Sequence, residues 1–346
     1  MEFLFLKSVN INIVLSWIII AILFVRIILK KKSKQVCFSL WGILCFKFFI
    51  PFSFECRWSL IPSIETFSIE DIYNRSFRIH SGISKLDEIL NNIIGSRYYE
   101  GVTVPTGAMS FTLKILSITW FAGILVFLIG FIIYTLKLKR NLCTAVHFEK
   151  NIWESDIITS PFVFGFFKPR IYIPFNLTQI EINNVVAHES SHIKHGDHLW
   201  QLLVYLLLML NWYNPLIWLA YKKFIDDMEL ACDERVIKKM DISARKNYSK
   251  ILLNCTVNQT FTLGEQLYFG RENIKERVVN IVKYKKQSKS VFLFSVGLLL
   301  IVAICFLTNP ENSNGQNILE LLKVINNKCL CCLIPKTNRK IMTNPI

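Results

Sequence analysis

The sequence predicts a mainly α-helical, polytopic membrane protein with four transmembrane helices and a cytoplasmic domain. Of its 346 residues, 52% are hydrophobic and only 19% are charged, whereas ordinary soluble domains carry roughly 25% charged residues. Several apolar runs approach the length of about 20 residues that crosses a bilayer. One stretch also has the His-Glu-x-x-His spacing that is typical of zinc peptidases. Together these features favour a membrane protein over a soluble one, and 27 Phe with only 13 Gly and 10 Pro exclude a disordered or collagen-like chain.

Four apolar runs are predicted to cross the membrane, because each is interrupted by few or no charges. They are residues 11–29, 36–54, 115–136 and 291–307. We therefore expect the following organisation: 1–54, helices one and two with a short basic loop; 55–110, an external loop; 111–136, helix three; 137–290, the cytoplasmic zinc domain; 291–307, helix four; 308–346, a short external tail.

Orientation follows from the basic residues, which favour the cytoplasmic side of a membrane. The first short loop contains Lys30, Lys31, Lys32 and Lys34, so we expect this loop inside the cell and the N-terminus outside. Basic residues also outnumber acidic ones in 222–290, which indicates a cytoplasmic position. Because the net charge of +15 follows the loops and does not form one patch, direct binding of nucleic acid is not expected.

A fifth apolar run, residues 199–221, is predicted to dip into the membrane as a helical hairpin. It is interrupted at Asn211 to Asn214 and by Pro215, and proline disfavours helix at the residue before it. The two arms, of about 12 and 7 residues, are too short to span at 1.5 Å per residue. A full crossing would also separate 222–290 from the rest of the predicted metal site.

The chemistry is concentrated in His188-Glu189-Ser190-Ser191-His192. Thr178 and Glu181 have the spacing of a capping box, which begins a helix through the motif. On a helix, His188 and His192 share one face and can bind a single Zn²⁺. Zinc lowers the pKa of a bound water towards about 7, and Glu189 is placed to accept its proton. We therefore expect metal-assisted peptide hydrolysis.

Spacing alone leaves the third zinc ligand open among His195, His198 and Glu229. His195 shares the face of the other histidines, but its Cα lies about 10.5 Å along the helix from that of His188. His198 would follow a pattern that needs glycine at 195, whereas the glycine is at 196. Glu229 and Asp233 share a face of a later helix, so one could bind zinc while the other orients a histidine.

Three motifs in order give the chain a resemblance to the membrane metallopeptidases of the β-lactam-sensing antirepressor family, the BlaR/MecR type. They are the segment 160–174, the zinc helix through Asp197, and Glu229-Leu230-Ala231-Cys232-Asp233-Glu234. With the four spans, the resemblance covers residues 1 to about 310. It implies a gluzincin-like site in which His188, His192 and Glu229 bind zinc and Glu189 is the base. It also implies supporting roles for Asp197 and Asp233, and two short strands within 162–174.

The resemblance implies a protease that cleaves itself or a cytoplasmic DNA-binding repressor and so relays an external signal. Sensors of this family continue into an external penicillin-binding domain, whereas 39 residues follow Leu307 here, so direct acylation by a β-lactam is not expected. The basic stretch 271–290 matches the family's self-cleavage region and also suits a cytoplasmic flank. Two other functions stay open: a quality-control or processing protease, and a non-enzymatic scaffold. The sequence also leaves open whether the protein forms a homodimer and what Cys329, Cys331 and Cys332 do.

Overall fold

The protein is described by a computed structural model that covers residues 1–29, 33–50, 88–89, 92, 106–257, 274–286 and 288–308. Most of the expected external loop and tail lie outside these residues, as do Lys30 to Lys32 and the cysteines at 329, 331 and 332. The helices are α1 (Glu2–Leu29), α2 (Lys34–Phe49), α5 (Thr106–Asn141), α6 (Gln179–His195), α7 (Asp197–Leu210), α8 (Pro215–Ile237), α9 (Ile242–Val257), α11 (Ile274–Val282) and α12 (Lys289–Leu307). A 3-10 turn (Leu142–Thr144) leads to the strands β1 (Val146–Glu149), β2 (Ile152–Ser155), β3 (Phe162–Phe164) and β4 (Arg170–Pro174).

Three helices in the described part of the chain are long and apolar enough to cross a membrane. They are α1, α5 and α12, which contain the first, third and fourth predicted spans. The predicted second span corresponds to α2, a helix of 16 residues. Its expected continuation over residues 51–54 lies outside the described residues. The number of crossings therefore stays a prediction.

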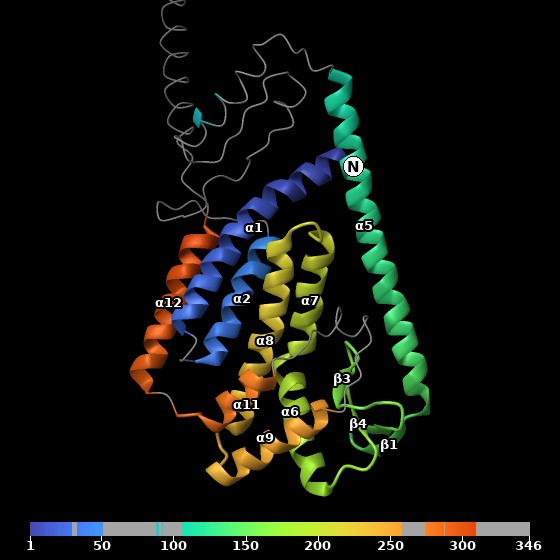
Figure 1. The fold of residues 1–346 in the computed structure, drawn as a ribbon, viewed down its shortest axis with the longest axis vertical. Helices are drawn as coiled ribbons and strands as arrows, with labels where there is room; N and C mark the ends of the chain where they lie inside the picture. The colour runs from blue at the N-terminus through green and yellow to red at the C-terminus, as the bar shows by residue number, and fades with distance from the viewer. Residues whose placement is uncertain are drawn as a thin grey trace, which may run out of the picture.

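The helices α1, α2, α7, α8 and α12 lie side by side, with the sheet, α6, α9 and α11 gathered at one end (Figure 1). Their shared core contains the fully buried side chains of Leu15, Ile18, Trp41 and Phe224. The structure therefore divides into an apolar bundle and a more polar region beneath it. One element, α8, runs from the first into the second.

The expected hairpin is present, but its second arm is longer than predicted. The helix α7 ends at Leu210, and α8 begins at Pro215 after the interruption that the sequence indicates. We expected the second arm to end at residue 221, whereas α8 continues to Ile237. Lys222 and Lys223 end the apolar run but are good helix formers, so the change in polarity does not end the helix.

Polar side chains fix the tip of this hairpin to α1. The amide of Asn12 donates to the side-chain oxygens of Asn211 and Tyr213, and its own carbonyl oxygen accepts from Asn214 at 2.9 Å. The indole of Trp212 lies so close to Gly123 of α5 that a Cβ there would clash. The tip therefore meets both α1 and α5.

The four strands form one sheet in the order β1-β2-β4-β3, in which β2 and β4 are parallel and β3 is an edge strand. β3 and β4 form the antiparallel hairpin predicted within 162–174. Gly165 in its turn has a φ of +116°, which side chains rarely adopt. Ile171 and Ile173 of β4 pack on the first turns of α6. This contact holds the sheet beside the helix that carries the histidine motif.

Candidate metal centre

The predicted zinc motif lies on α6, as expected. Thr178 accepts a hydrogen bond from the backbone of Glu181, whose carboxylate accepts from the backbone of Thr178 at 2.9 Å, so the capping box is complete. The helix ends at Gly196, which adopts a left-handed φ of 67°. Ile182 and Val185 face the sheet. The histidines and glutamate of the motif are also buried, within the region between α6, α8 and α11.

The side chains of His188, His192 and Glu229 converge. The Nε2 atoms of the two histidines are 3.1 Å apart. The Glu229 carboxylate lies 3.3 Å from the first and 3.6 Å from the second. In a tetrahedral site with zinc–ligand distances of 2.0–2.1 Å, neighbouring ligand atoms are about 3.3 Å apart. Among the described residues Glu229 Oε2 makes no hydrogen bond of normal geometry, although the Arg277 guanidinium lies 3.2 Å away. This donor set therefore fits a tetrahedral divalent metal.

The other nitrogen of His188 is held by two side chains that keep Nε2 directed at the metal position. Its Nδ1 lies 2.8 Å from the hydroxyl of Tyr248, which donates to Asp233 Oδ1, also at 2.8 Å. Because that hydroxyl proton is used by Asp233, the imidazole donates from Nδ1, and in its neutral form the lone pair is on Nε2. Asp233 thus acts on His188 through Tyr248, a residue that the sequence did not indicate.

His192 is oriented in the same way by Asp197. Its Nδ1 donates to Asp197 Oδ2 at 2.8 Å, and the same oxygen accepts from Arg235 at 2.7 Å. Asp197 is 1% exposed. Both carboxylates that the sequence marked as supporting groups therefore contact the bonding network of a ligand histidine.

Arg277 of α11 brings a buried positive charge to the centre. Its guanidinium makes a bidentate bond to Asp233 (2.8 and 2.9 Å) and lies 3.2 Å from Glu229 Oε2. Burial raises the pKa of Glu229, but Arg277 and His192 outweigh it and hold that pKa well below its usual value. No motif distinguishes Arg277 in the sequence, because this residue lies in the basic stretch that also suits a membrane flank.

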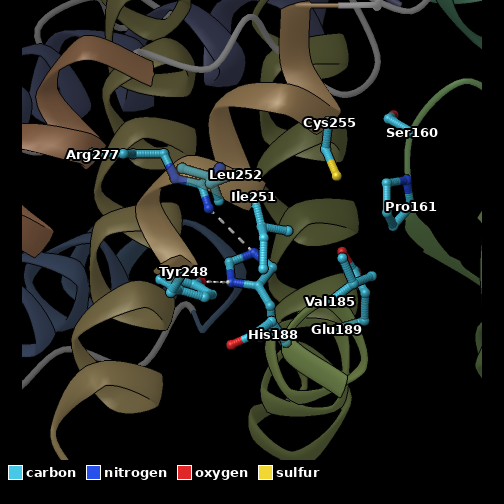
Figure 2. A pocket seen from close by; sticks show the side chains of 11 residues that line it. Ser160, Pro161, Val185, His188, Glu189, Tyr248, Ile251, Leu252, Cys255 and Arg277 are labelled. Carbon is cyan, nitrogen blue, oxygen red and sulfur yellow. Dashed lines mark hydrogen bonds between the residues drawn. The ribbon is translucent and has the colours of Figure 1, made fainter. Parts of the chain in front are cut away.

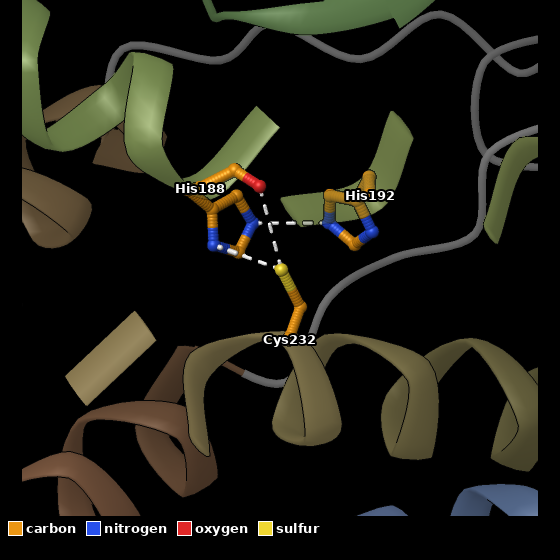
Figure 3. A group of neighbouring side chains, drawn as sticks. All are labelled: His188, His192 and Cys232. Atoms are coloured by element: carbon orange, nitrogen blue, oxygen red, sulfur yellow. Dashed lines mark hydrogen bonds between the residues drawn. The ribbon is translucent and has the colours of Figure 1, made fainter. Parts of the chain in front are cut away.

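Cys232 also faces the histidines, as Figure 3 shows. Its Sγ lies 3.5 Å from His188 Nδ1, and the three residues together form a group that could hold a metal. Burial would raise the pKa of this thiol, but the two imidazoles lower it to about 7. However, Sγ meets the His188 nitrogen that is bonded to Tyr248. We therefore favour Glu229 as the third ligand.

Glu189 lies beside a pocket that reaches the centre (Figure 2). Ser160 and Pro161, directly before β3, line the pocket opposite Arg277. The remaining lining residues are mostly apolar and come from α6 and α9: Val185, Ile251, Leu252 and Cys255. Burial raises the pKa of Glu189 above its usual value despite the nearby imidazoles. A carboxylate with a raised pKa is a better proton acceptor near neutral pH.

The two other candidate ligands are not brought to the centre. His195 is exposed, and its Nδ1 lies 2.9 Å from the backbone oxygen of Ser191. His198 lies beyond the left-handed turn at Gly196, near the start of α7. Of the three alternatives, Glu229 alone shares the described cluster.

Comparisons with known proteins place the chain near a family of membrane peptidases. The family model described as BlaR1 peptidase M56 matches residues 6–281. The regulatory protein BlaR1 of Bacillus licheniformis is 29% identical over 161 residues, which cover 43% of this chain and 27% of that protein. The methicillin resistance mecR1 protein of Staphylococcus aureus (strain Mu50) is 29% identical over 143 residues, or 39% and 24% of the two chains. The match to the BlaR1 of Staphylococcus aureus is 25% over 185 residues, or 50% and 31%. Each match spans less than a third of the relative.

Proposed function

This chain belongs to the BlaR1 peptidase M56 family, and on that premise we propose that it is a membrane zinc metalloendopeptidase in transmembrane signalling. Its substrates would be the chain itself, a cytoplasmic repressor, or both. The observation that carries the proposal is the convergence of His188, His192 and Glu229 within 3.1–3.6 Å, next to Glu189. Zinc, when bound there, would supply a Lewis acid that acidifies water and polarises a peptide carbonyl.

Glu189 is the proposed general base. It would accept a proton from the attacking water and return this proton to the leaving amine, so that hydrolysis consumes one water and leaves the enzyme unchanged. Its burial and its place in the pocket wall support this role. Asp197 and Asp233, the latter through Tyr248, would hold the ligand imidazoles in one tautomer and orientation.

An extended polypeptide suits the entrance of the pocket. β3 is an edge strand, and the two residues before it line the pocket wall. An edge strand can pair with the backbone of a peptide, while the apolar pocket receives a side chain. For self-cleavage within 271–290, a cut inside α11 would require this helix to unfold. That change would also withdraw Arg277 from the metal centre.

We also propose that the protein crosses the membrane four times, with its N-terminus outside and the metal centre in the cytoplasm. The apolar helices α1, α5 and α12 and the basic loop between α1 and α2 support this topology. In this arrangement the α7–α8 hairpin enters the bilayer from the cytoplasmic side. Replacing Lys30, Lys31, Lys32 and Lys34 with asparagine should change the accessibility of an N-terminal tag. An unchanged accessibility would contradict the proposed orientation.

The activity is tested with Glu189→Gln in the purified chain reconstituted in liposomes. We expect the variant to keep its zinc, because all three ligands remain, but to lose cleavage of itself and of added extended peptides in mass spectrometry. Glu149→Gln, at an exposed position of β1, is the matched control and should cleave normally. Proteolysis by the Glu189 variant would refute the mechanism.

The substrates found in this experiment also separate the alternatives. A few cuts in the chain or in one regulator would support signalling. Cleavage of many unrelated membrane proteins would instead indicate quality control or processing. A buried network orients both histidines. Metal binding explains this network and a scaffold role does not, so the network supports an enzyme.

A further inference from the structure

The helix α8 carries acidic residues on two opposite sides. Successive residues of a helix are turned by about 100°, so Asp227 and Glu229 point in nearly opposite directions. Asp227 and Glu234, seven residues apart, share one side and face α1 and α2. Glu229 and Asp233 share the other side and face the metal centre. One rigid element therefore connects the bundle to a metal ligand.

The bundle side of α8 is held by a compact polar contact. Arg26 of α1 donates from Nε to both carboxylate oxygens of Asp227, at 2.9 and 2.7 Å. The indole of Trp41 in α2 donates to the second of these oxygens at 2.9 Å. Trp41 and Asp227 are 1% and 2% exposed. Because this charge is buried, separating the partners is strongly unfavourable, and α8 is fixed against both helices.

A second contact lies two turns further along α8. Glu234 Oε2 accepts from the backbone N–H groups of Lys34 and Gln35, at 2.9 and 3.2 Å. These are the first residues of α2, where backbone donors lack partners within the helix. Glu229 lies between Asp227 and Glu234 along α8. The helix is therefore held in place both before and after the residue that faces the metal centre.

We propose that Arg26, Trp41 and Asp227 form a positioning clamp that sets the place of Glu229 relative to the two ligand histidines. No glycine interrupts α8, and its only proline is its first residue, so a displacement at Asp227 reaches Glu229 within one turn. Metal sites require ligand distances within about 0.2 Å. A change in the packing of α1 against α2 therefore changes metal affinity. The inference rests on the proposed function and adds the path by which the bundle controls the site.

The test compares Asp227→Asn with Asp226→Asn in the full chain. Asp226 is similarly buried, and within the described ranges its carboxylate bonds to Lys223 of the same helix and not to α1 or α2. Zinc affinity is measured by competition with a chromophoric chelator, and thermal unfolding is followed with and without zinc. We expect about tenfold weaker zinc binding and a smaller zinc-induced rise in Tm for Asp227→Asn. The zinc affinity of Asp226→Asn should stay within about twofold of the wild-type value, well below the roughly 10–100-fold loss that follows removal of a group supporting a metal ligand.

Two further variants keep the inference refutable. Trp41→Phe removes a single hydrogen bond from the clamp and should weaken zinc binding less than Asp227→Asn. Combining Arg26→Gln with Asp227→Asn should weaken zinc binding no more than Asp227→Asn alone, because both changes break the same pair.

The outcomes distinguish the clamp from the proposed function. If Asp227→Asn lowers Tm but leaves zinc affinity and the zinc-induced shift at wild-type values, the contact only stabilises the fold and the clamp is refuted. If Asp227→Asn does not fold, an unchanged zinc affinity of Trp41→Phe refutes it equally. A folded wild-type chain without zinc affinity overturns the proposed function itself, and the clamp with it.

Discussion

Replacing Arg277 with methionine tests the charge balance of the metal centre. Arg277 is 3% exposed and faces two buried carboxylates, Asp233 at 2.8 and 2.9 Å and Glu229 at 3.2 Å. Methionine fills a similar volume but leaves both carboxylates without this cation. Removing one partner of a buried ion pair costs about 3–5 kcal/mol. In domains of about 150–250 residues each kcal/mol lowers Tm by about 2–4 °C, and this shift becomes smaller as the chain lengthens. For this chain of 346 residues the lower bound of about 3 kcal/mol therefore predicts a decrease of several degrees, at most about 6–12 °C.

The assay is thermal unfolding of the metal-free, detergent-purified chain. Lys275→Met, at an exposed position of the same helix, is the control and should change Tm by about 2 °C or less. Arg277→Lys should fall between the two, because lysine keeps the charge but cannot make the bidentate bond. Added zinc should reduce the deficit of Arg277→Met, since the metal compensates Glu229 but not Asp233. Equal Tm values for Arg277→Met and Lys275→Met would refute the reasoning.

Three further predictions concern metal binding. Elemental analysis should find about one zinc per wild-type chain. The zinc content should fall with Glu229→Ala and stay unchanged with Cys232→Ser. The reverse result would make the thiol the third ligand. Burial would lower the pKa values of His188 and His192, but Cys232, Glu229 and Asp197 raise them well above the usual value. The imidazoles must lose these protons to bind zinc, so affinity should keep increasing as the pH rises beyond the ordinary imidazole pKa of about 6.5 in competition titrations, and a flat profile would contradict this. Asp197→Asn should weaken zinc binding by about 10–100-fold, because His192 loses its orienting carboxylate; isothermal titration showing wild-type affinity would leave Asp197 a purely structural role.

The features that the sequence predicted correctly are local ones. The capping box and the four-residue spacing of the histidines lie within one helix, so a short stretch determines both the helix and the relative position of the two side chains. The long apolar runs are local in the same sense. The β-hairpin within 162–174 followed from a stretch whose turn contains Gly165.

The features that spacing could not predict depend on contacts between distant segments. Arg277 reaches a histidine 89 positions earlier, and Tyr248 reaches the same histidine across 60 positions. Neither residue has neighbours that form a motif. Glu229 was one of three alternatives from spacing alone, because its distance from His188 depends on how α8 packs against α6. The prediction for α8 was too short because it ended the arm where the apolar run ends, at residue 221. The helix itself continues to Ile237, since polar residues can extend a helix that leaves an apolar environment.

The shortness of β3 limits how strongly a free peptide can bind. Alternate residues of an edge strand direct both backbone groups outward, so the three residues of β3 offer about two to four hydrogen bonds, each contributing roughly 1 kcal/mol. Binding with a Kd of 1 mM already requires about 4.1 kcal/mol, so backbone pairing alone holds a freely diffusing substrate only weakly. A segment tethered to the same chain or the same bilayer reaches an effective concentration in the millimolar range. An enzyme of the proposed kind would select its substrates largely by proximity, and its weak intrinsic affinity would protect unrelated proteins from cleavage.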